Sequence, residues 1–176
     1  MCHLLLVLDL LLLHTVSGSK LHHITSSPIS QCPTGESCLT LSMFAANTSS
    51  YLDLNTTLVL LAGNHILDSQ LLVSNVDEFL IILSTNSSVT ASITCRSNAI
   101  LKFINITHMH IGRLEFIRCN TRVENLEHFT LEDSSFQSNN DDGSALHLIE
   151  TSTKIVRTSF SNSMGSYQNH VSFLKF

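Results

Sequence analysis

The sequence predicts an all-β protein, built as a parallel β-solenoid and destined for export. Three observations carry this prediction: an apolar run close to the first residue, an even number of cysteines after it, and a phenylalanine-containing segment that recurs every 20 to 24 residues. Only 13% of the 176 residues are charged, and serine, threonine and asparagine are abundant. This composition is typical of short strands joined by polar turns, and the length suits one domain.

Residues 1–18 are predicted to be a signal peptide. Residues 4–13 are almost entirely apolar, and Val16, Ser17 and Gly18 are the small residues that a signal peptidase needs before Ser19. Two features depart from the usual pattern, because no Lys or Arg precedes the apolar run and Asp9 interrupts it. The alternative is a buried strand or helix of the mature fold. The run is shorter than the roughly 20 residues that span a bilayer, so we expect a secreted, extracellular chain without a membrane span.

The charge of the exported chain argues against one class of partner. Removing residues 1–18 takes away Asp9 and no Lys or Arg, which leaves 13 acidic and 9 basic residues and a net charge near −4. No basic run is present that would neutralise a phosphate backbone. We therefore expect no nucleic-acid partner.

Cleavage after Gly18 would leave four cysteines: Cys32, Cys38, Cys95 and Cys119. An even count in an exported chain predicts two disulfides, for which three pairings are possible. Proximity in the sequence favours Cys32–Cys38 and Cys95–Cys119. The alternative is a zinc site, but neither a C-x-x-C spacing nor a nearby histidine pair supports it.

Four N-glycosylation sequons follow the predicted signal peptide. Their asparagines are Asn47, Asn55, Asn86 and Asn105. About this number is expected by chance in a chain so rich in Asn, Ser and Thr. The sequons are informative only because the signal peptide would carry them past the glycosylation machinery.

The elements expected along the chain are mostly short strands. Residues 19–37 hold both prolines and are expected to form an irregular lead-in, and residues 39–46 are the one convincing helix. Residues 62–64 are expected to form a turn. The predicted strands are runs of apolar and β-branched residues bounded by Ser, Asn or Asp: residues 57–61, 71–73, 79–83, 89–95 and 100–106.

The C-terminal half contains a repeat. Residues 109–120, 129–140 and 153–164 align without gaps, and in each an aliphatic residue lies five positions before a phenylalanine. This period fits one coil of a parallel β-solenoid, in which successive coils stack about 4.8 Å apart. Phe116, Phe136 and Phe160 are expected to form one internal stack, and Ile111, Leu131 and Ile155 another.

Two further pairs of residues recur with this period. Cys95 and Cys119 are 24 residues apart, so adjacent coils would bring their Cα atoms within disulfide range. Asn120 and Asn140 would form a hydrogen-bonded ladder at one turn. The alternative is an antiparallel β-sandwich, because its short, regularly spaced strands look similar in sequence.

Several of these residues resemble a known group of proteins. Phe136-Gln-Ser-Asn139 and Gly143-Ser-Ala-Leu146 resemble the F-x-x-N and G-G-A-[IL] repeats of polymorphic outer-membrane proteins, which also occur in many secreted β-helix proteins. Residues 38–41, 57–61 and 63–65 resemble the opening of large extracellular β-helix proteins of invertebrates. The resemblance implies a right-handed, single-stranded parallel β-helix of the pectin-lyase-like type over residues 38–176. The helix at residues 39–46 would cap its N-terminal coil, and its C-terminal end would be incomplete.

We expect no group of catalytic, cofactor-binding or metal-binding residues in this chain. Pectin-lyase-like enzymes use clustered carboxylates beside a basic residue. Asp141-Asp142 lies in an expected solvated turn, and Glu132-Asp133 in another turn without a matching carboxylate one coil away.

Two histidine pairs are expected to be structural or surface groups. His108 and His110 would point to the same side of a strand, a spacing that can bind a metal, but no third ligand is evident at the matching position of the next coil. We interpret them as surface or groove histidines, and we interpret His22-His23, in the lead-in, in the same way.

The resemblance therefore implies a non-enzymatic, secreted or cell-surface β-helix module. Its function would be extracellular structure, adhesion or glycan binding, with extracellular glycans or other β-helix chains as partners. The alternative is a carbohydrate-active enzyme, a polysaccharide lyase or hydrolase, or an inactive relative of one. Fold alone does not decide between them.

Overall fold

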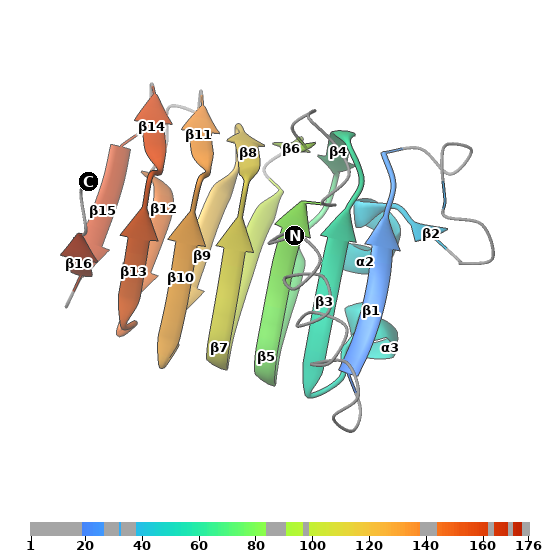
Figure 1. Ribbon diagram of the computed structural model, residues 1–176, viewed down its shortest axis with the longest axis horizontal. Coiled ribbons are helices and arrows are strands. Elements are labelled where there is room, and N and C mark those ends of the chain that lie inside the picture. Colours follow the sequence, from blue (N-terminus) through green and yellow to red (C-terminus); the bar gives the residue numbers. More distant parts are fainter. Residues whose placement is uncertain are drawn as a thin grey trace, which may run out of the picture.

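The computed structural model describes residues 19–26, 32, 38–83, 91–96, 99–137, 144–161, 164–168 and 171–173. The predicted signal peptide (1–18), Asn86, Asn140 and the Asp141-Asp142 turn lie outside these residues. Within them the protein is all-β, with two short helices near the start (Figure 1).

The elements follow one another in a simple order along the chain. The first part contains β1 (Ser19–Ile24), β2 (Cys38–Leu39), α2 (Leu41–Ala46), α3 (Thr48–Tyr51), β3 (Asn55–Leu60), β4 (Gly63–Leu67), β5 (Leu71–Leu83), β6 (Ala91–Cys95) and β7 (Ile100–Gly112). The second part contains β8 (Leu114–Ile117), β9 (Asn120–Glu124), β10 (His128–Glu132), β11 (Ser135–Gln137), β12 (Ser144–Ile149), β13 (Thr153–Val156), β14 (Ser159–Ser161), β15 (Met164–Gln168) and β16 (Val171–Phe173).

The described strands form two sheets in which all pairs are parallel. One sheet has 11 strands and the other has five, in the order β14-β11-β8-β6-β4. Adjacent strands come from successive passes of the chain, which lie side by side along the molecule (Figure 1). Antiparallel pairing is absent from the described sheets, so the alternative of an antiparallel sandwich is wrong.

The predicted repeat is confirmed by the strand register. Phe116 lies opposite Phe136, and Phe136 opposite Phe160. Their ring centroids are 4.6 Å and 5.0 Å apart, with interplanar angles of 10° and 11°. The predicted aliphatic column is present as well, with Ile111, Leu131 and Ile155 in register. Six phenylalanines are fully buried: Phe44, Phe79, Phe103, Phe116, Phe129 and Phe136.

An asparagine ladder is present, but not at the predicted turn. Asn75, Asn105 and Asn125 have φ of 58°, 52° and 54°, a left-handed conformation that asparagine tolerates better than most residues. The Nδ2 of Asn105 donates to Oδ1 of Asn75 at 3.2 Å, and the Nδ2 of Asn125 donates to Oδ1 of Asn105 at 3.3 Å. By contrast, Asn120 lies within β9, opposite Ile100. The ladder therefore lies on other asparagines than the expected pair, of which Asn140 is outside the described residues.

Several expected boundaries differ in the structure. The predicted strands 71–73 and 79–83 are one strand, β5, because the chain continues through the left-handed Asn75. The turn expected at residues 62–64 lies earlier in the chain, because Leu61 and Ala62 separate β3 from β4 and Gly63 and Asn64 begin β4. Gly63 has a φ of 131°, and a Cβ there would lie 3.0 Å from Oγ of Ser26. A glycine is therefore required where the chain enters β4.

Both disulfides join the cysteines that sequence proximity favours. Cys95 and Cys119 have Cα atoms 5.0 Å apart, and Cys32 and Cys38 have Cα atoms 5.7 Å apart. Cys95 and Cys119 are buried in the hydrophobic core. Two disulfides are compatible with an extracellular location. Among the described residues, no helix has the length and apolar character needed to cross a bilayer.

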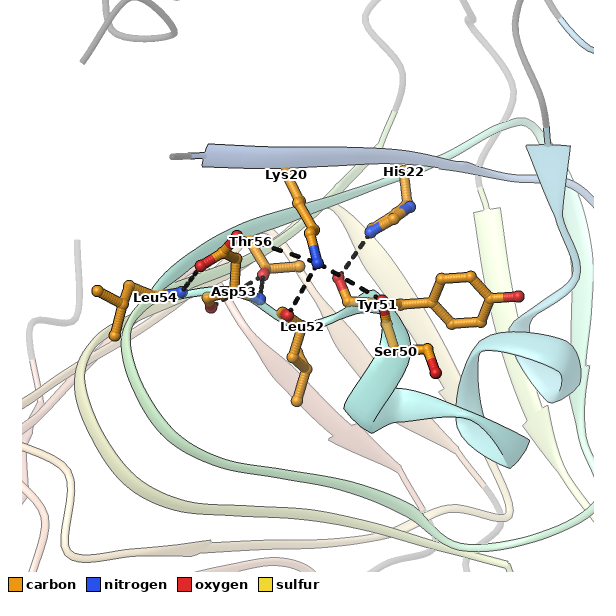
Figure 2. Close-up of polar contacts among 8 residues, drawn as sticks. All are labelled: Lys20, His22, Ser50, Tyr51, Leu52, Asp53, Leu54 and Thr56. Carbon is orange, nitrogen blue, oxygen red and sulfur yellow. Dashed lines mark hydrogen bonds and ion pairs between the residues drawn. The ribbon is translucent and has the colours of Figure 1, made fainter. Parts of the chain in front are cut away.

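The start of the expected irregular lead-in is a strand. Residues 19–24 form β1, which pairs with β3 along its whole length. Figure 2 shows Lys20 and His22 pointing from β1 toward the end of α3. Lys20 Nζ donates to the carbonyl of Leu52 at 3.2 Å, and His22 Nε2 lies 2.8 Å from the carbonyl of Tyr51. His22 is therefore a structural residue that holds β1 against α3.

The predicted helix at residues 39–46 is observed as α2, which begins two residues later. The Oγ1 of Thr40 accepts from the backbone N–H of Met43 at 3.2 Å and so caps the helix N-terminus. Leu41 and Phe44 are buried in the hydrophobic core. The helix therefore supplies apolar side chains at the end of the core where β1 lies.

Candidate functional site on the five-stranded sheet

The outer face of the five-stranded sheet carries a row of polar side chains. Asn64, Ser92, Glu115, Ser135 and Ser159 lie in register on five adjacent strands. None of these residues is buried. Because neighbouring strands are about 4.8 Å apart, the row presents hydroxyl, amide and carboxylate groups at regular intervals.

This row is already organised by hydrogen bonds. The Oδ1 of Asn64 accepts from Oγ of Ser92 at 3.2 Å and from Oγ1 of Thr94 at 2.7 Å. The side-chain amide of Gln137 donates to the carboxylate of Glu115. These contacts hold the polar groups in place before any ligand arrives, which lowers the entropy lost on binding.

A column of charged residues borders the row. Arg113, Asp133 and Arg157 each occupy the turn between the two sheets, with φ of 59°, 48° and 46°. The backbone N–H of Arg113 donates to the carbonyl of Glu132 at 3.0 Å, and that of Asp133 donates to Val156 at 3.1 Å. The three turns therefore stack in register, and their charges alternate.

The charges in this column are not equivalent. Arg157 makes a two-pronged contact with Asp133, and its Nη2 lies 2.8 Å from Oδ2. Hydrogen bonding to Arg157 lowers the pKa of Asp133, and the same contact raises the pKa of Arg157. The guanidinium of Arg113 makes no hydrogen bond or ion pair with any residue that the structure describes, and Arg113 is exposed. Arg113 is thus the cation of this column that a ligand can pair with.

These groups surround a hollow of about 410 Å³. Its walls come from three successive turns and the strands that follow them. The lining residues are Arg113, Leu114, Glu115, Asp133, Ser134, Ser135, Arg157 and Ser159. A guanidinium beside several hydroxyls matches a ligand that carries both an acid group and hydroxyl groups.

Sequence reasoning found only part of this site. Glu132 closes β10 instead of lying in a turn, whereas Asp133 does occupy one. No carboxylate matches Glu132 in the neighbouring strands, as expected, because its partners are Gly112 and Val156. The two arginines were missed. Their signal was the repeat itself, since Arg113, Asp133 and Arg157 each precede a stacked phenylalanine by three residues.

A second group of polar residues lies on the outer face of the 11-stranded sheet. His108 and His110 point to the same side of β7, as predicted, and a histidine that was not noticed in the sequence lies at the matching position of the next coil. His128 lies opposite His108, with ring centroids 5.0 Å apart. The aligned repeat indicated that His108 and His128 are neighbours, because they directly precede Met109 and Phe129, two core residues that lie opposite each other. Among the described residues, no three His, Cys, Asp or Glu side chains are arranged to hold a metal ion.

The predicted glycosylation residues differ in their surroundings. Asn47 and Asn105 are exposed, Asn55 is half-buried, and Asn86 is outside the described residues. Asn105 is also the middle member of the asparagine ladder.

The chain was also compared with known proteins. No family model, curated protein or solved structure matches it.

Proposed function

We propose that this chain is a secreted, non-enzymatic, right-handed parallel β-helix module that binds acidic glycans in the hollow beside Arg113. The parallel pairing supports the fold assignment, because the chain returns to the same register after 20 to 30 residues. Parallel crossover connections are right-handed in about 98% of cases. In this fold α2 and α3 cap the first coil.

One observation carries the choice of ligand. Arg113 is an exposed guanidinium with no hydrogen-bond partner among the described side chains, and it lies in a hollow also lined by Ser135 and Ser159. The third serine, Ser134, is buried, and its hydroxyl is already bonded to the carbonyl of Glu132 and the N–H of Leu114. Guanidinium groups bind carboxylates and sulfates in two-pronged geometry, while serine hydroxyls both donate to and accept from sugar hydroxyls. A uronate or a sulfated sugar carries both kinds of group.

The state of Asp133 favours binding over catalysis. Its pKa is lowered by the hydrogen bond from Arg157, so at neutral pH the carboxylate is ionised and already paired with the Arg157 guanidinium. A general acid or base needs a pKa near the working pH. Asp133 is therefore suited to positioning Arg157 and not to transferring a proton.

Binding of polygalacturonate fragments, measured by calorimetry, tests this function. The variant Arg113→Asn removes the guanidinium and keeps a residue that tolerates a positive φ. We expect it to weaken binding about tenfold or more, since a charge-assisted hydrogen bond contributes about 1.5–3 kcal/mol.

Lys102→Gln is the matched control. Lys102 lies on the other sheet, opposite Arg122, so this change removes the same charge away from the hollow. Equal binding by the wild type and Arg113→Asn would overturn the proposed site. Cleavage of polygalacturonate or a glycosaminoglycan by the wild type would instead support the alternative of a carbohydrate-active enzyme.

A further inference from the structure

The three outward histidines form a groove with neighbouring polar and apolar residues. His108 lies between Glu78 of β5 and His128 of β10, and His110 lies between Leu80 and Thr130. The groove has a volume of about 160 Å³. This is less than half the volume of the hollow at Arg113, so the space suits a single sugar residue more than a long chain segment.

The groove keeps two of its histidines close together and the third beside a carboxylate. The His108 and His128 rings are 5.0 Å apart and inclined at 34°. His110 Nε2 lies 3.1 Å from Oε1 of Glu132. Gly112 permits this contact, because a Cβ there would lie 2.9 Å from Nε2 of His110.

Protonation of the histidines reverses the charge of the groove. Its lining contains Glu78 and three histidines, and Glu132 lies against His110, so the formal charge is −2 when the histidines are neutral and +1 when all are protonated. Histidine is the side chain whose charge ordinarily changes between pH 5 and 8. Two protonated rings 5.0 Å apart repel each other, and an anion that accepts hydrogen bonds from both rings would relieve this repulsion.

The groups around the groove restrict the size of an anionic ligand. Three further charged residues lie on the strands and turns that border this face: Asp77, Glu127 and Lys154. They add −1, so the whole face changes only from −3 to 0. The facing residues of β3 are uncharged: Asn55, Thr57 and Val59. The positive potential in acid is therefore confined to the groove.

We propose that the histidine groove binds the acid group of a single carboxylated or sulfated sugar residue at mildly acidic pH and releases it at neutral pH. This groove differs from the hollow at Arg113 in location and in chemistry. Arginine keeps its charge across this pH range, so binding at Arg113 does not need acid, whereas binding in the groove does.

NMR titration of the intact protein with glucuronate, glucose 6-sulfate and glucose tests the proposal. We expect one of the two acids to shift the ring signals of His108 and His128 at pH 5.5, with an affinity about tenfold higher than at pH 7.5. The comparison of the two acids identifies the acid group. The doubly substituted variant His108→Gln/His128→Gln should lose this pH dependence.

Two controls separate the groove from the rest of the protein. Lys102→Gln and Arg113→Asn should both keep the pH-dependent binding, which distinguishes this site from the hollow. Backbone amide spectra establish that each variant is folded. The proposal is overturned if the histidine signals do not move, if glucose binds as well as the acids, if affinity is equal at both pH values, or if Arg113→Asn abolishes binding.

Discussion

At the scale of single residues, the left-handed backbone positions determine how this chain turns. Eight described non-glycine residues have φ between 46° and 59°. Asparagine fills three of these positions, where its amide also joins the next turn. Arg113, Asp133 and Arg157 occupy another three, although bulky residues are disfavoured at positive φ. The positive φ is unfavourable for these residues, but it brings their charged side chains beside one another at the rim of the five-stranded sheet.

His65 is a buried residue whose ionisation opposes folding. It is 1% exposed, and its Nε2 lies 2.7 Å from the carbonyl of Leu61. Burial lowers the pKa of His65, while backbone hydrogen bonds at Leu61 and Thr25 act in the opposite direction. Because the folded-state pKa is below the unfolded value of about 6.5, the fold is favoured when His65 is neutral.

The contribution of neutral His65 to the free energy of unfolding should therefore be fully present above about pH 6.5. It should be lost as the pH decreases from there toward the folded-state pKa of His65. Urea unfolding at pH 7.5 and pH 5.0 measures this loss. His65→Gln should show a smaller difference between the two pH values, whatever its absolute stability. The pKa of His147 is lowered as well, by burial and by Arg122, so part of the loss should persist. An unchanged difference in His65→Gln would contradict this account.

At the scale of elements, β1 depends on contacts with α3 as well as on its pairing with β3. The His22 ring lies 5.7 Å from that of Phe44, in α2, and 5.5 Å from that of Tyr51, in α3. It also makes a hydrogen bond with the carbonyl of Tyr51 (Figure 2). A hydrogen bond contributes about 1 kcal/mol and an aromatic contact about 0.5–1.5 kcal/mol.

We therefore predict that His22→Ala lowers the free energy of opening β1 by about 2 kcal/mol. Hydrogen exchange should show the amides of β1 exchanging roughly 30-fold faster, with those of β10 unchanged. Leu21→Ala is the matched control, because Leu21 is on the same strand and is 41% exposed. Faster exchange throughout the sheets, or in neither variant, would show that His22 does not hold this strand.

The sequence allowed the core elements to be predicted better than the outer surface. Stacking of Phe116, Phe136 and Phe160 followed from their spacing, because burial restricts which residues can occupy a core position. β1 was missed because Lys20 and His22 make its alternation look polar, and their partners are backbone carbonyls of α3. Arg113 and His128 were missed although the repeat gave their register, because an exposed position accepts many residue types and its side chain does not reveal what it contacts.

At the scale of the whole molecule, the Cys95–Cys119 disulfide links consecutive passes of the chain. We predict that replacing both cysteines by alanine lowers the free energy of unfolding by about 3 kcal/mol, because the bond closes a 24-residue loop. Replacing Cys32 and Cys38, which are six residues apart, should cost about 2 kcal/mol. Urea unfolding of both double variants measures which of the two loses more free energy of unfolding. A larger loss from the shorter loop would contradict the chain-entropy explanation.

The asparagine ladder has a consequence for how such a chain can change over time. Asn75 and Asn105 are 30 residues apart and Asn105 and Asn125 only 20, yet both pairs make the same amide contact. The difference of ten residues is absorbed between the turns, without disturbing the column. Insertions and deletions in these connections can therefore be inherited one at a time, and a lineage can remodel one segment of the surface while the shared core continues to fold.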